Sequence, residues 1–269
     1  MAKIIALVGK GGVGKTTICS AIVRILGEKN KDARILAIDA DPAVGLATAL
    51  GVTVPKTLDD IRKEIIEKAE AGAGREAVEL LGEVRFRIFD ALVEEDRFAF
   101  LAIGRPEGAG CYCAVNAYLK EVIEMVSRDF DYVVIDGEAG IEQINRRVME
   151  KVTHLFLVTD ASKKGFQVIQ TIKEVADQLV MYEKCGVILN RVPEGTVLFD
   201  TFSVPEGEPF GSSSMIKENN LPEILGKISV DPAHERNDIL GKSIFELSTQ
   251  APVYRGTYDA LEKMGLLVE

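Results

Sequence analysis

The sequence predicts an α/β fold in which a mostly parallel central sheet has helices on both faces. Three observations predict it: apolar runs of strand length recur along the 269 residues, stretches with helical periodicity lie between them, and the first run ends in glycines that open the first helix. Alternating strands and helices favour parallel pairing, because each helix returns the chain to the same end of the sheet. We expect a single domain over residues 1–269, with ligands bound at the carboxyl ends of the strands.

The expected elements follow in chain order. Strands are predicted at residues 3–8, 34–38, 98–103, 132–135, 154–158 and 185–189, and helices at 16–29, 114–127, 145–151 and 164–181. A final surface helix is expected after Pro252. Residues 56–96 are charged and helix-rich with no strong strand pattern, which predicts a helical excursion off the sheet. Residues 193–222 concentrate Pro, Gly and Ser, which is typical of a mobile loop.

Composition and charge narrow the partners and the compartment. Hydrophobic residues make up 47% of the chain and charged residues 28%, as in soluble globular proteins. The formal net charge of -10, without a dense Lys/Arg run, disfavours nucleic acid and anionic membranes as partners. The apolar opening is too short to span a bilayer and has no small-residue cleavage site. Four cysteines without an export signal then indicate a cytoplasmic protein, in which paired cysteines favour metal chemistry over disulfides.

Residues 9–17, GKGGVGKTT, are expected to form a phosphate-binding loop. Gly9, Gly14, Lys15 and Thr16 match the pattern G-x-x-x-x-G-K-[ST] between a predicted strand and a predicted helix. Glycines let consecutive backbone N–H groups face the phosphates, and the positive end of the helix adds to the anion site. Lys15 is expected to reach the β- and γ-phosphates of ATP, and Thr16 to bind Mg²⁺. The other nucleotide-binding positions expected in the loop are Gly11, Gly12, Val13 and Thr17.

Lys10 makes this loop more specific than an ordinary phosphate loop, which tolerates any residue there. The loop resembles the deviant Walker A pattern, K-G-G-x-G-K-[ST]-T, of the family that contains nitrogenase iron protein, the Min and Par positioning ATPases and several metal-maturation ATPases. The resemblance implies a nucleotide-sandwich homodimer in which Lys10 reaches the phosphates bound to the partner. Lys10 is therefore a candidate catalytic residue together with Lys15. The alternative is a solvated loop lysine.

Three aspartates follow predicted strands in the order that this family uses. Asp39 and Asp41 lie in ILAIDADP, and Asp136 ends the apolar run YVVID. The resemblance implies that Asp41 positions the attacking water, that Asp39 supports Mg²⁺ from its outer shell, and that Asp136 holds Mg²⁺ through water. Residues 137–140 then correspond to the second switch. Each aspartate taken alone has a plainer interpretation as a helix cap or turn residue.

Asn190 and Arg191 follow the predicted strand GVIL, where this family commonly places an asparagine that reads the adenine edge. The resemblance assigns both residues to nucleotide binding, although an asparagine at a strand end is often only a turn former. Residues 230–232, Val-Asp-Pro, end a later strand and are further candidates for lining the base.

Cys111 and Cys113 form a Cys-x-Cys element between a predicted strand and a predicted helix. Two thiolates at this spacing chelate one soft ion but supply only half of a tetrahedral sulfur site, and the copy in a two-fold dimer supplies the other half. Two buried thiols brought near each other by chance are the alternative, and a disulfide in so small a ring is disfavoured. Cys19 and Cys185 are expected to be small core residues.

The segment GRPEGAGCYCAVN, together with the loop and with IDGEAGIEQINRR, resembles the nickel-insertion ATPases of carbon monoxide dehydrogenase maturation (CooC-type), or their relatives that serve acetyl-CoA synthase. The resemblance covers residues 3 to about 191. It implies an ATP-hydrolysing metallochaperone that binds Ni²⁺, or Zn²⁺ in its place, across a homodimer and delivers it to a client nickel enzyme. Residues 56–96 and 193–222 are not explained by the shared motifs.

Two other functions stay open at this point. An electron-transfer ATPase of the nitrogenase iron protein type shares an iron–sulfur cluster between protomers, but its second cysteine after the Walker B strand has no counterpart in residues 136–147. Four thiolates from two Cys-x-Cys elements could still hold a cluster. A Min- or Par-like positioning ATPase predicts a basic surface or a lipid-binding tail, and this acidic chain shows neither.

Overall fold

The computed structural model describes residues 2–41, 44–61, 63–64, 88–104, 124–137, 152–193 and 221–267. Within these ranges eight strands form one sheet, in the order β3-β4-β2-β5-β1-β6-β7-β8. The strands are β1 (Lys3–Gly9), β2 (Ile35–Asp39), β3 (Leu92–Glu94), β4 (Ala99–Ala102), β5 (Tyr132–Asp136), β6 (His154–Thr159), β7 (Lys184–Val192) and β8 (Ile224–Ser229). Every neighbouring pair is parallel except β3 and β4, which are antiparallel. The predicted mostly parallel sheet is confirmed.

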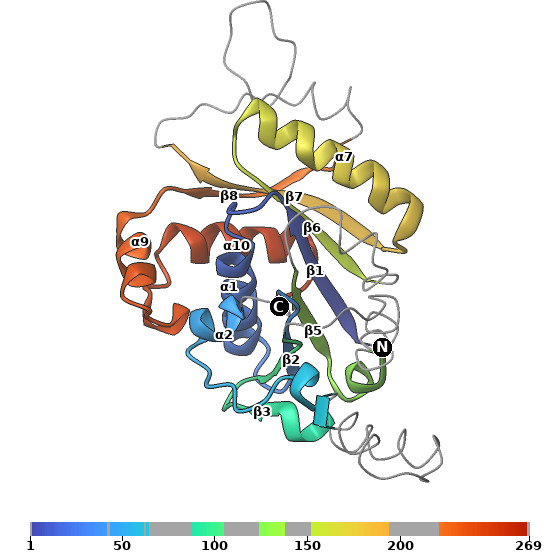
Figure 1. The fold of residues 1–269 in the computed structure, drawn as a ribbon. Coiled ribbons are helices and arrows are strands. Elements are labelled where there is room, and N and C mark those ends of the chain that lie inside the picture. Colours follow the sequence, from blue (N-terminus) through green and yellow to red (C-terminus); the bar gives the residue numbers. More distant parts are fainter. Residues whose placement is uncertain are drawn as a thin grey trace, which may run out of the picture.

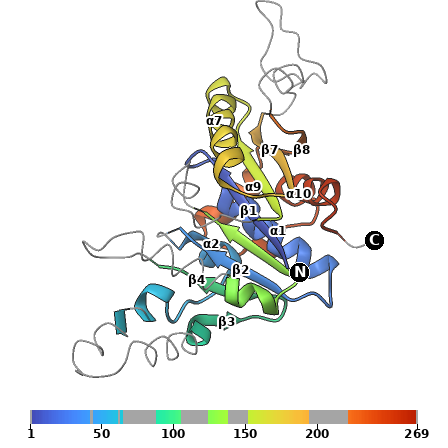
Figure 2. The same ribbon diagram turned by 90° about the vertical axis from the view of Figure 1, so that its right-hand side faces the viewer.

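Helices lie on both faces of the sheet, as predicted (Figures 1 and 2). They are α1 (Lys15–Lys29), α2 (Gly45–Leu50), α7 (Lys163–Leu179), α9 (Pro232–Ile239) and α10 (Pro252–Lys263), with short 3-10 turns η1 (Ile88–Ala91), η2 (Ser127–Asp129) and η3 (Ile244–Glu246). Helices α1, α2 and α10 pack on one face, and α7 packs on the other. None of the helices in the described ranges has both the length and the apolar character of a membrane span.

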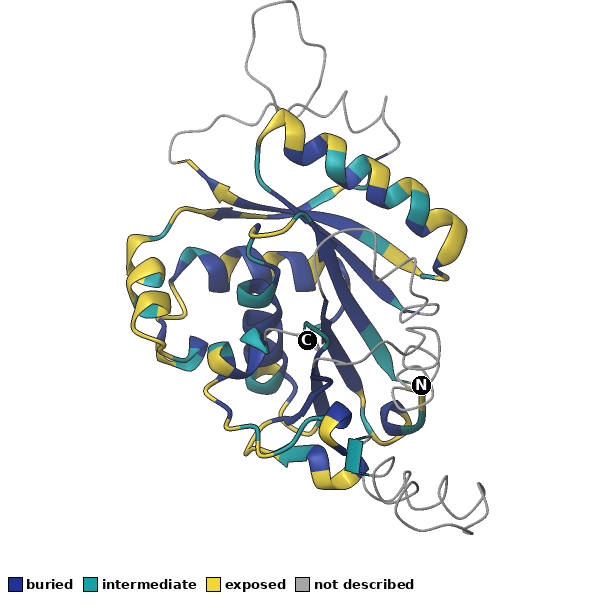
Figure 3. Cartoon of the chain, in the orientation of Figure 1, coloured by how far each residue is buried: buried dark blue, intermediate teal, exposed yellow. Residues whose placement is uncertain are grey.

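Alternating side chains of the central strands supply two apolar layers. Along β1, Ile5 and Leu7 join the layer under α1 and α10, whereas Ala6 and Val8 join the layer under α7. Figure 3 shows the strands as a largely buried sheet between helices whose outer surfaces are exposed. Because successive residues of a strand point to opposite faces, both layers are anchored on the same backbone. The strand ends that carry the polar residues of interest are therefore held by a core on both sides.

The helix predicted after Pro252 is confirmed as α10, and residues of its inner face, among them Ala260 and Leu261, are completely buried. Two glycines allow its close approach to β8. A Cβ atom added to Gly226 would lie 2.2 Å from the carbonyl oxygen of Gly256, and one added to Gly256 would lie 2.4 Å from the carbonyl oxygen of Lys227. The backbones of α10 and β8 are thus in direct contact.

The segment of residues 56–96, which has no strong strand pattern in the sequence, contains one short strand at its end. Residues 92–94 form β3, which pairs antiparallel with β4 at the edge of the sheet. The turn between them is closed by a 2.9 Å bond from the Glu95 N–H to the Phe98 carbonyl. Three residues are too few to show the alternating pattern of a strand in the sequence. Strand β3 is stabilised by its pairing with β4. Residues 65–87 and 194–220, and most of the helices predicted at 114–127 and 145–151, lie outside the described residues.

Candidate nucleotide-binding and hydrolysis site

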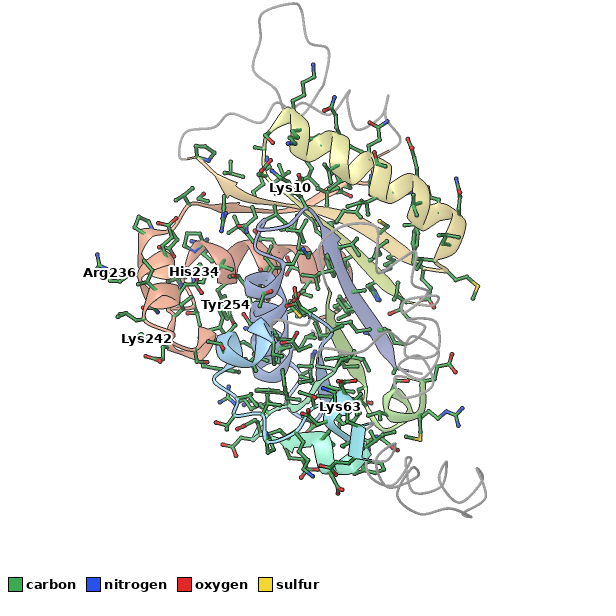
Figure 4. The ribbon with its side chains drawn as sticks, viewed as in Figure 1. Lys10, Lys63, His234, Arg236, Lys242 and Tyr254 are labelled. Atoms are coloured by element: carbon green, nitrogen blue, oxygen red, sulfur yellow. The ribbon has the colours of Figure 1, made fainter. Side chains whose placement is uncertain are left out.

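The polar residues predicted for the site lie at one edge of the sheet. The loop of residues 9–14 follows β1, Asp39 ends β2 and Asp136 ends β5. These three strands are neighbours and run parallel, so their carboxyl ends meet. Lys10 marks this edge in Figure 4, at the end of β1 away from the amino terminus. The arrangement places the glycine loop and the two carboxylates within one site, where α/β sheets bind their ligands.

The loop has a conformation that depends on glycine. Gly12 and Gly14 have φ angles of 72° and 94°, in the left-handed region that side chains disfavour. Gly14 is also the N-cap of α1, which has neither a side-chain cap nor an acidic residue in its first turn. The first N–H groups of this helix are consequently available to an anion. Beside the loop is a cavity of about 220 Å³, lined by Gly11, Gly12, Gly14, Lys15, Thr16, Asp41, Gly137 and Arg191.

The Lys15 side chain folds back over the loop. Its residue is 7% exposed, and its Nζ atom lies 3.3 Å from both the Gly9 carbonyl oxygen and the Lys10 carbonyl oxygen. Burial lowers the pKa of this ammonium group, whereas the charges of Asp136 and Asp41 oppose the shift. An ammonium group held by two neutral carbonyls at the wall of the cavity is well placed to exchange them for phosphate oxygens.

Asp39 and Asp136 occupy paired positions on β2 and β5, and both side chains are buried. The carboxylate of Asp39 accepts bonds from the N–H groups of Asp41 (3.1 Å) and Leu46 (2.8 Å). Burial nevertheless raises its pKa to about 6. Burial likewise raises the pKa of Asp136 to about 7, with the Thr16 hydroxyl opposing and the Asp39 charge adding to the shift.

Both carboxylate oxygens of Asp136 are buried without a hydrogen-bond partner of ordinary geometry. Buried polar atoms are nearly always satisfied in proteins, so two orphaned oxygens facing a phosphate loop indicate a missing partner. A divalent cation with oxygen ligands fits this donor set, because Mg²⁺ binds carboxylates, hydroxyls and nucleotide phosphates. Thr16 and Asp136 are the residues that would hold it, and Mg²⁺ would supply charge neutralisation between the phosphates.

Asp41 lines the cavity next to Lys15 and donates its backbone N–H to the Asp39 carboxylate. Its predicted part in positioning the attacking water stays a prediction. Gly137, the first residue of the predicted second switch, also lines the cavity, and residues 138–140 lie outside the described ranges. The metal-binding candidates Cys111 and Cys113 lie outside them too.

Lys10 forms an ion pair that the sequence did not predict. Its Nζ atom lies 3.7 Å from Oδ2 of Asp160, and the two side chains are 40% and 32% exposed. Asp160 directly follows β6 and also accepts a 3.0 Å bond from the Ser162 N–H at the start of α7. Its position after the apolar run 154–158 was the available signal, because a polar residue that ends a parallel strand lies at the ligand edge.

Asn190 and Arg191 both reach the loop region, in different ways. The Asn190 side chain is held by the backbone: its Nδ2 donates to the Val13 carbonyl at 2.8 Å, and its Oδ1 accepts from the Arg191 N–H at 2.9 Å. Arg191 lines the cavity and has a φ angle of 54°, which is rare outside glycine. Among residues 230–232, which are predicted to line the base, Asp231 caps α9, with its carboxylate accepting from the Ala233 N–H at 2.9 Å. Their contact with a base stays a prediction.

The fold and this site define a P-loop ATPase: a glycine loop with its lysine and threonine, followed by buried aspartates at the ends of neighbouring parallel strands. The chain belongs to the AAA domain family, whose model matches residues 2–183. It is 36% identical over 266 residues to an uncharacterized ATP-binding protein of Methanocaldococcus jannaschii, covering 97% of this chain and 98% of the relative.

Two further comparisons extend this result. The carbon monoxide dehydrogenase accessory protein CooC of Rhodospirillum rubrum is 28% identical over 253 residues, covering 91% of this chain and 90% of the relative. The septum site-determining protein MinD of Pyrococcus horikoshii, solved as a complex with Mg-ADP, superposes with a TM-score of 0.67 at 21% identity, covering 98% of this chain and 96% of that one. The structural likeness is one of fold.

Proposed function

We propose that this ATPase is a homodimeric metallochaperone that binds nickel through Cys111 and Cys113 and delivers it to a carbon monoxide dehydrogenase or an acetyl-CoA synthase. The observation that carries the proposal is the coexistence, in one chain similar to CooC over 91% of its length, of the Lys10 loop and the Cys-x-Cys element. Nickel is the cargo in this scheme, and ATP with Mg²⁺ controls the dimer that holds it.

The position of Lys10 supports a role outside its own phosphate loop. Lys15 already contacts the loop of its own protomer, because its Nζ atom donates to the Gly9 and Lys10 carbonyls. The Lys10 ammonium instead forms a partly exposed pair with Asp160, which follows β6. An exposed ion pair of this kind is worth only about 0.2–1 kcal/mol, so it yields readily to a stronger partner. The phosphates of a nucleotide bound to a second protomer are such a partner, since they carry several negative charges.

The cysteine segment begins beside the nucleotide site. It follows β4, whose last residues run alongside Asp39 of β2, and the Ile103 N–H donates to the Asp39 carbonyl at 2.9 Å. Cys111 is the seventh residue after Gly104 and Cys113 is the ninth, and extended chains of these lengths span at most about 25 Å and about 32 Å. The Cα atoms of both cysteines of one protomer therefore lie within about 32 Å of the strand end next to the buried carboxylates. This proximity supports coupling between nucleotide state and cargo.

The other two cysteines are poor candidates for soft-metal ligands. Cys19 is completely buried in α1, and burial raises the pKa of its thiol well above the usual range. Burial also raises the pKa of Cys185 to about 12. Since the thiolate is the form that binds metal, both thiols are suppressed as ligands at neutral pH.

Equilibrium dialysis of anaerobically purified apoprotein against Ni²⁺, with metal analysis, tests the proposal. We expect about one nickel ion per dimer and loss of binding in Cys111→Ser and in Cys113→Ser. Cys185→Ser is the matched control and should bind nickel as the wild type does. Nickel binding unchanged in both Cys-x-Cys variants would refute the assignment. A brown protein that contains iron would support the iron–sulfur reductase instead.

The dimer is tested separately by sedimentation velocity in the presence of a non-hydrolysable ATP analogue and Mg²⁺. Lys10→Ala should remain monomeric while keeping some nucleotide binding, because Lys15 and the loop backbone are intact. Lys164→Ala removes an exposed lysine of α7 and serves as the control. An intact dimer in Lys10→Ala would show that Lys10 does not make the contact.

A further inference from the structure

The side chain of Asn190 is bonded both to the phosphate loop and to its own backbone. The residue is 7% exposed, and its amide group uses Nδ2 on the Val13 carbonyl and Oδ1 on the Arg191 N–H. The first bond joins residues 177 positions apart and ties the end of β7 to the middle of the loop. A side chain bound in this way has one of its two N–H donors and one acceptor lone pair already occupied.

The bond to Val13 fixes the direction of a whole peptide group. In a trans peptide the carbonyl of one residue and the N–H of the next point to opposite sides. With the Val13 carbonyl held toward Asn190, the Gly14 N–H must point to the other side of the peptide plane. Gly14 borders the 220 Å³ cavity, next to Lys15 and Thr16. The asparagine therefore sets the orientation of one of the donors that a phosphate would meet.

Gly14 leaves the space that the asparagine amide occupies. A Cβ atom added to Gly14 would lie 2.3 Å from Nδ2 of Asn190, closer than such contacts occur. Gly14 is therefore required for two independent reasons. Its φ angle is positive, and the Asn190 amide occupies the space that a side chain at position 14 would need.

The backbone around Asn190 is shaped to keep its side chain under the loop. The pairing of β7 with β8 shifts register between Leu189 and Val192, and Arg191 within that interval has a φ of 54°. Non-glycine residues in the left-handed region cost free energy and persist where surrounding contacts hold them. Here the contact is the bond from the Arg191 N–H to Oδ1 of Asn190. The register shift of β7, the left-handed φ of Arg191 and the bond from the Arg191 N–H all occur at or next to Asn190.

We propose that Asn190 is a positioning residue of the ATPase, which aims the Gly14 N–H at the phosphates through the Val13 carbonyl and does so independently of the nucleotide base. This role differs from adenine recognition, the role expected from the resemblance. The two roles separate cleanly, because a base reader loses only ligands that carry adenine, whereas a loop-positioning residue loses affinity for any polyphosphate.

Asn190→Asp is the sharpest test, since it keeps the size and the Oδ1 acceptor but replaces the Nδ2 donor with an oxygen that repels the Val13 carbonyl. Affinities for ATP, GTP and inorganic tripolyphosphate, each with Mg²⁺, are measured by calorimetry on one preparation. We expect all three to fall by a similar factor of about tenfold, the effect of one hydrogen bond replaced by a repulsion. The ratio of ATP to GTP affinity should not change, and kcat should fall because the γ-phosphate is less well held.

Asn30→Asp is the matched control. Asn30 is another buried asparagine whose Nδ2 faces a carbonyl, that of Leu266 at 3.5 Å, but it lies at the far end of α1. It should lower the melting temperature without changing any of the three affinities. If Asn190→Asp does not fold, Asn190→Ser serves in its place, and the ratio of affinities is independent of the folded fraction. A loss confined to ATP, or unchanged tripolyphosphate affinity, would overturn the proposal.

Discussion

Asp39 and Asp136 lie side by side on adjacent parallel strands, and each is buried at the carboxyl edge of the sheet beside the phosphate loop. Two carboxyl groups placed in this way cannot both ionise cheaply, because burial and mutual repulsion act in the same direction. Their pKa values are raised to about 6 and about 7. The nucleotide-free protein therefore keeps a destabilising feature at the place where a cation is expected.

This arrangement makes stability depend on pH in a defined direction. The folded pKa of each aspartate lies above its unfolded value of 3.8, so the folded state retains protons that the unfolded state has lost. The contribution of these two aspartates to the free energy of unfolding is fully present below pH 3.8 and is lost as the pH rises through about 6 and about 7. His154, whose pKa burial lowers to about 4, acts in the opposite direction below pH 6.5. A comparison of the wild type with a variant that lacks one of the aspartates separates the effect of the aspartates from that of His154.

Asp136→Asn should raise the melting temperature of the Mg²⁺-free protein at pH 8 and have a smaller effect at pH 5. A neutral amide removes the buried charge, and a gain of about 4 °C is expected, since about 1 kcal/mol shifts Tm by about 2–4 °C at this size. Calorimetric scans at both pH values measure it. Equal melting temperatures at pH 8 would contradict the raised pKa. In the same variant, ATP hydrolysis should be lost.

Asp160→Asn should strengthen ATP-dependent self-association, if the proposed dimer forms. The amide keeps an acceptor for the Ser162 N–H while it removes the charge that holds Lys10. A partly exposed pair is weak, so we expect at most about a fivefold lower dissociation constant for the dimer. Sedimentation equilibrium with an ATP analogue measures the constant. A weaker dimer would instead indicate that Asp160 helps to place Lys10 in the assembled state.

Gly256→Ala should destabilise the protein even though alanine is the better helix former. Alanine gains about 1 kcal/mol in a helix interior, but its Cβ would meet the Lys227 carbonyl at 2.4 Å. Overpacking of this kind costs about 1–3 kcal/mol, so the net change is a loss. Urea unfolding measures it. Gly27→Ala in α1 is the control, because the nearest atom to its new Cβ is a side-chain carbon of Arg97 at 3.3 Å; it should be neutral or stabilising.

Arg24→Lys should lower the free energy of unfolding by about 2–3 kcal/mol, since bonds from a buried charged donor are among the strongest. The Arg24 guanidinium donates to the carbonyls of Ile244 (2.7 Å) and Leu247 (2.8 Å) and to the Glu28 carboxylate (2.8 Å). A lysine cannot reach all three in this geometry. Arg255→Lys changes an exposed arginine of α10 and should have little effect. Equal urea midpoints for the two variants would count against this account.

The sequence was sufficient where the determinant is local. A glycine-rich loop between an apolar strand and a helix predicts its own conformation, so the positions of Lys15 and Thr16 follow from a few adjacent residues. The ends of strands also predict where Asp39 and Asp136 lie, because parallel strands share an edge. The fold class was predicted for the same reason, as the alternation of strands and helices is visible along the chain.

Features set by distant residues were not predicted. The pairing of Lys10 with Asp160 joins two loops 150 positions apart, and no local pattern reports it. The direction of the Asn190 amide depends on the shifted register of β7 and β8. Strand β3 depends on hydrogen bonds to β4, since three residues carry no periodicity of their own. In each case the local structure depends on a residue or strand that is distant in the sequence, so the local sequence alone does not predict it.

The bond between the Ile103 N–H and the Asp39 carbonyl has a mechanical consequence. It fastens the chain just after β4 to the backbone of Asp39, whose carboxylate is buried at the edge of the sheet beside the phosphate loop. Ile103 cannot move along the sheet without breaking this bond and disturbing the β2–β4 ladder beside it. A displacement of the Asp39 backbone is therefore transmitted directly to the chain end of β4, so the two neighbouring strand ends move as one unit.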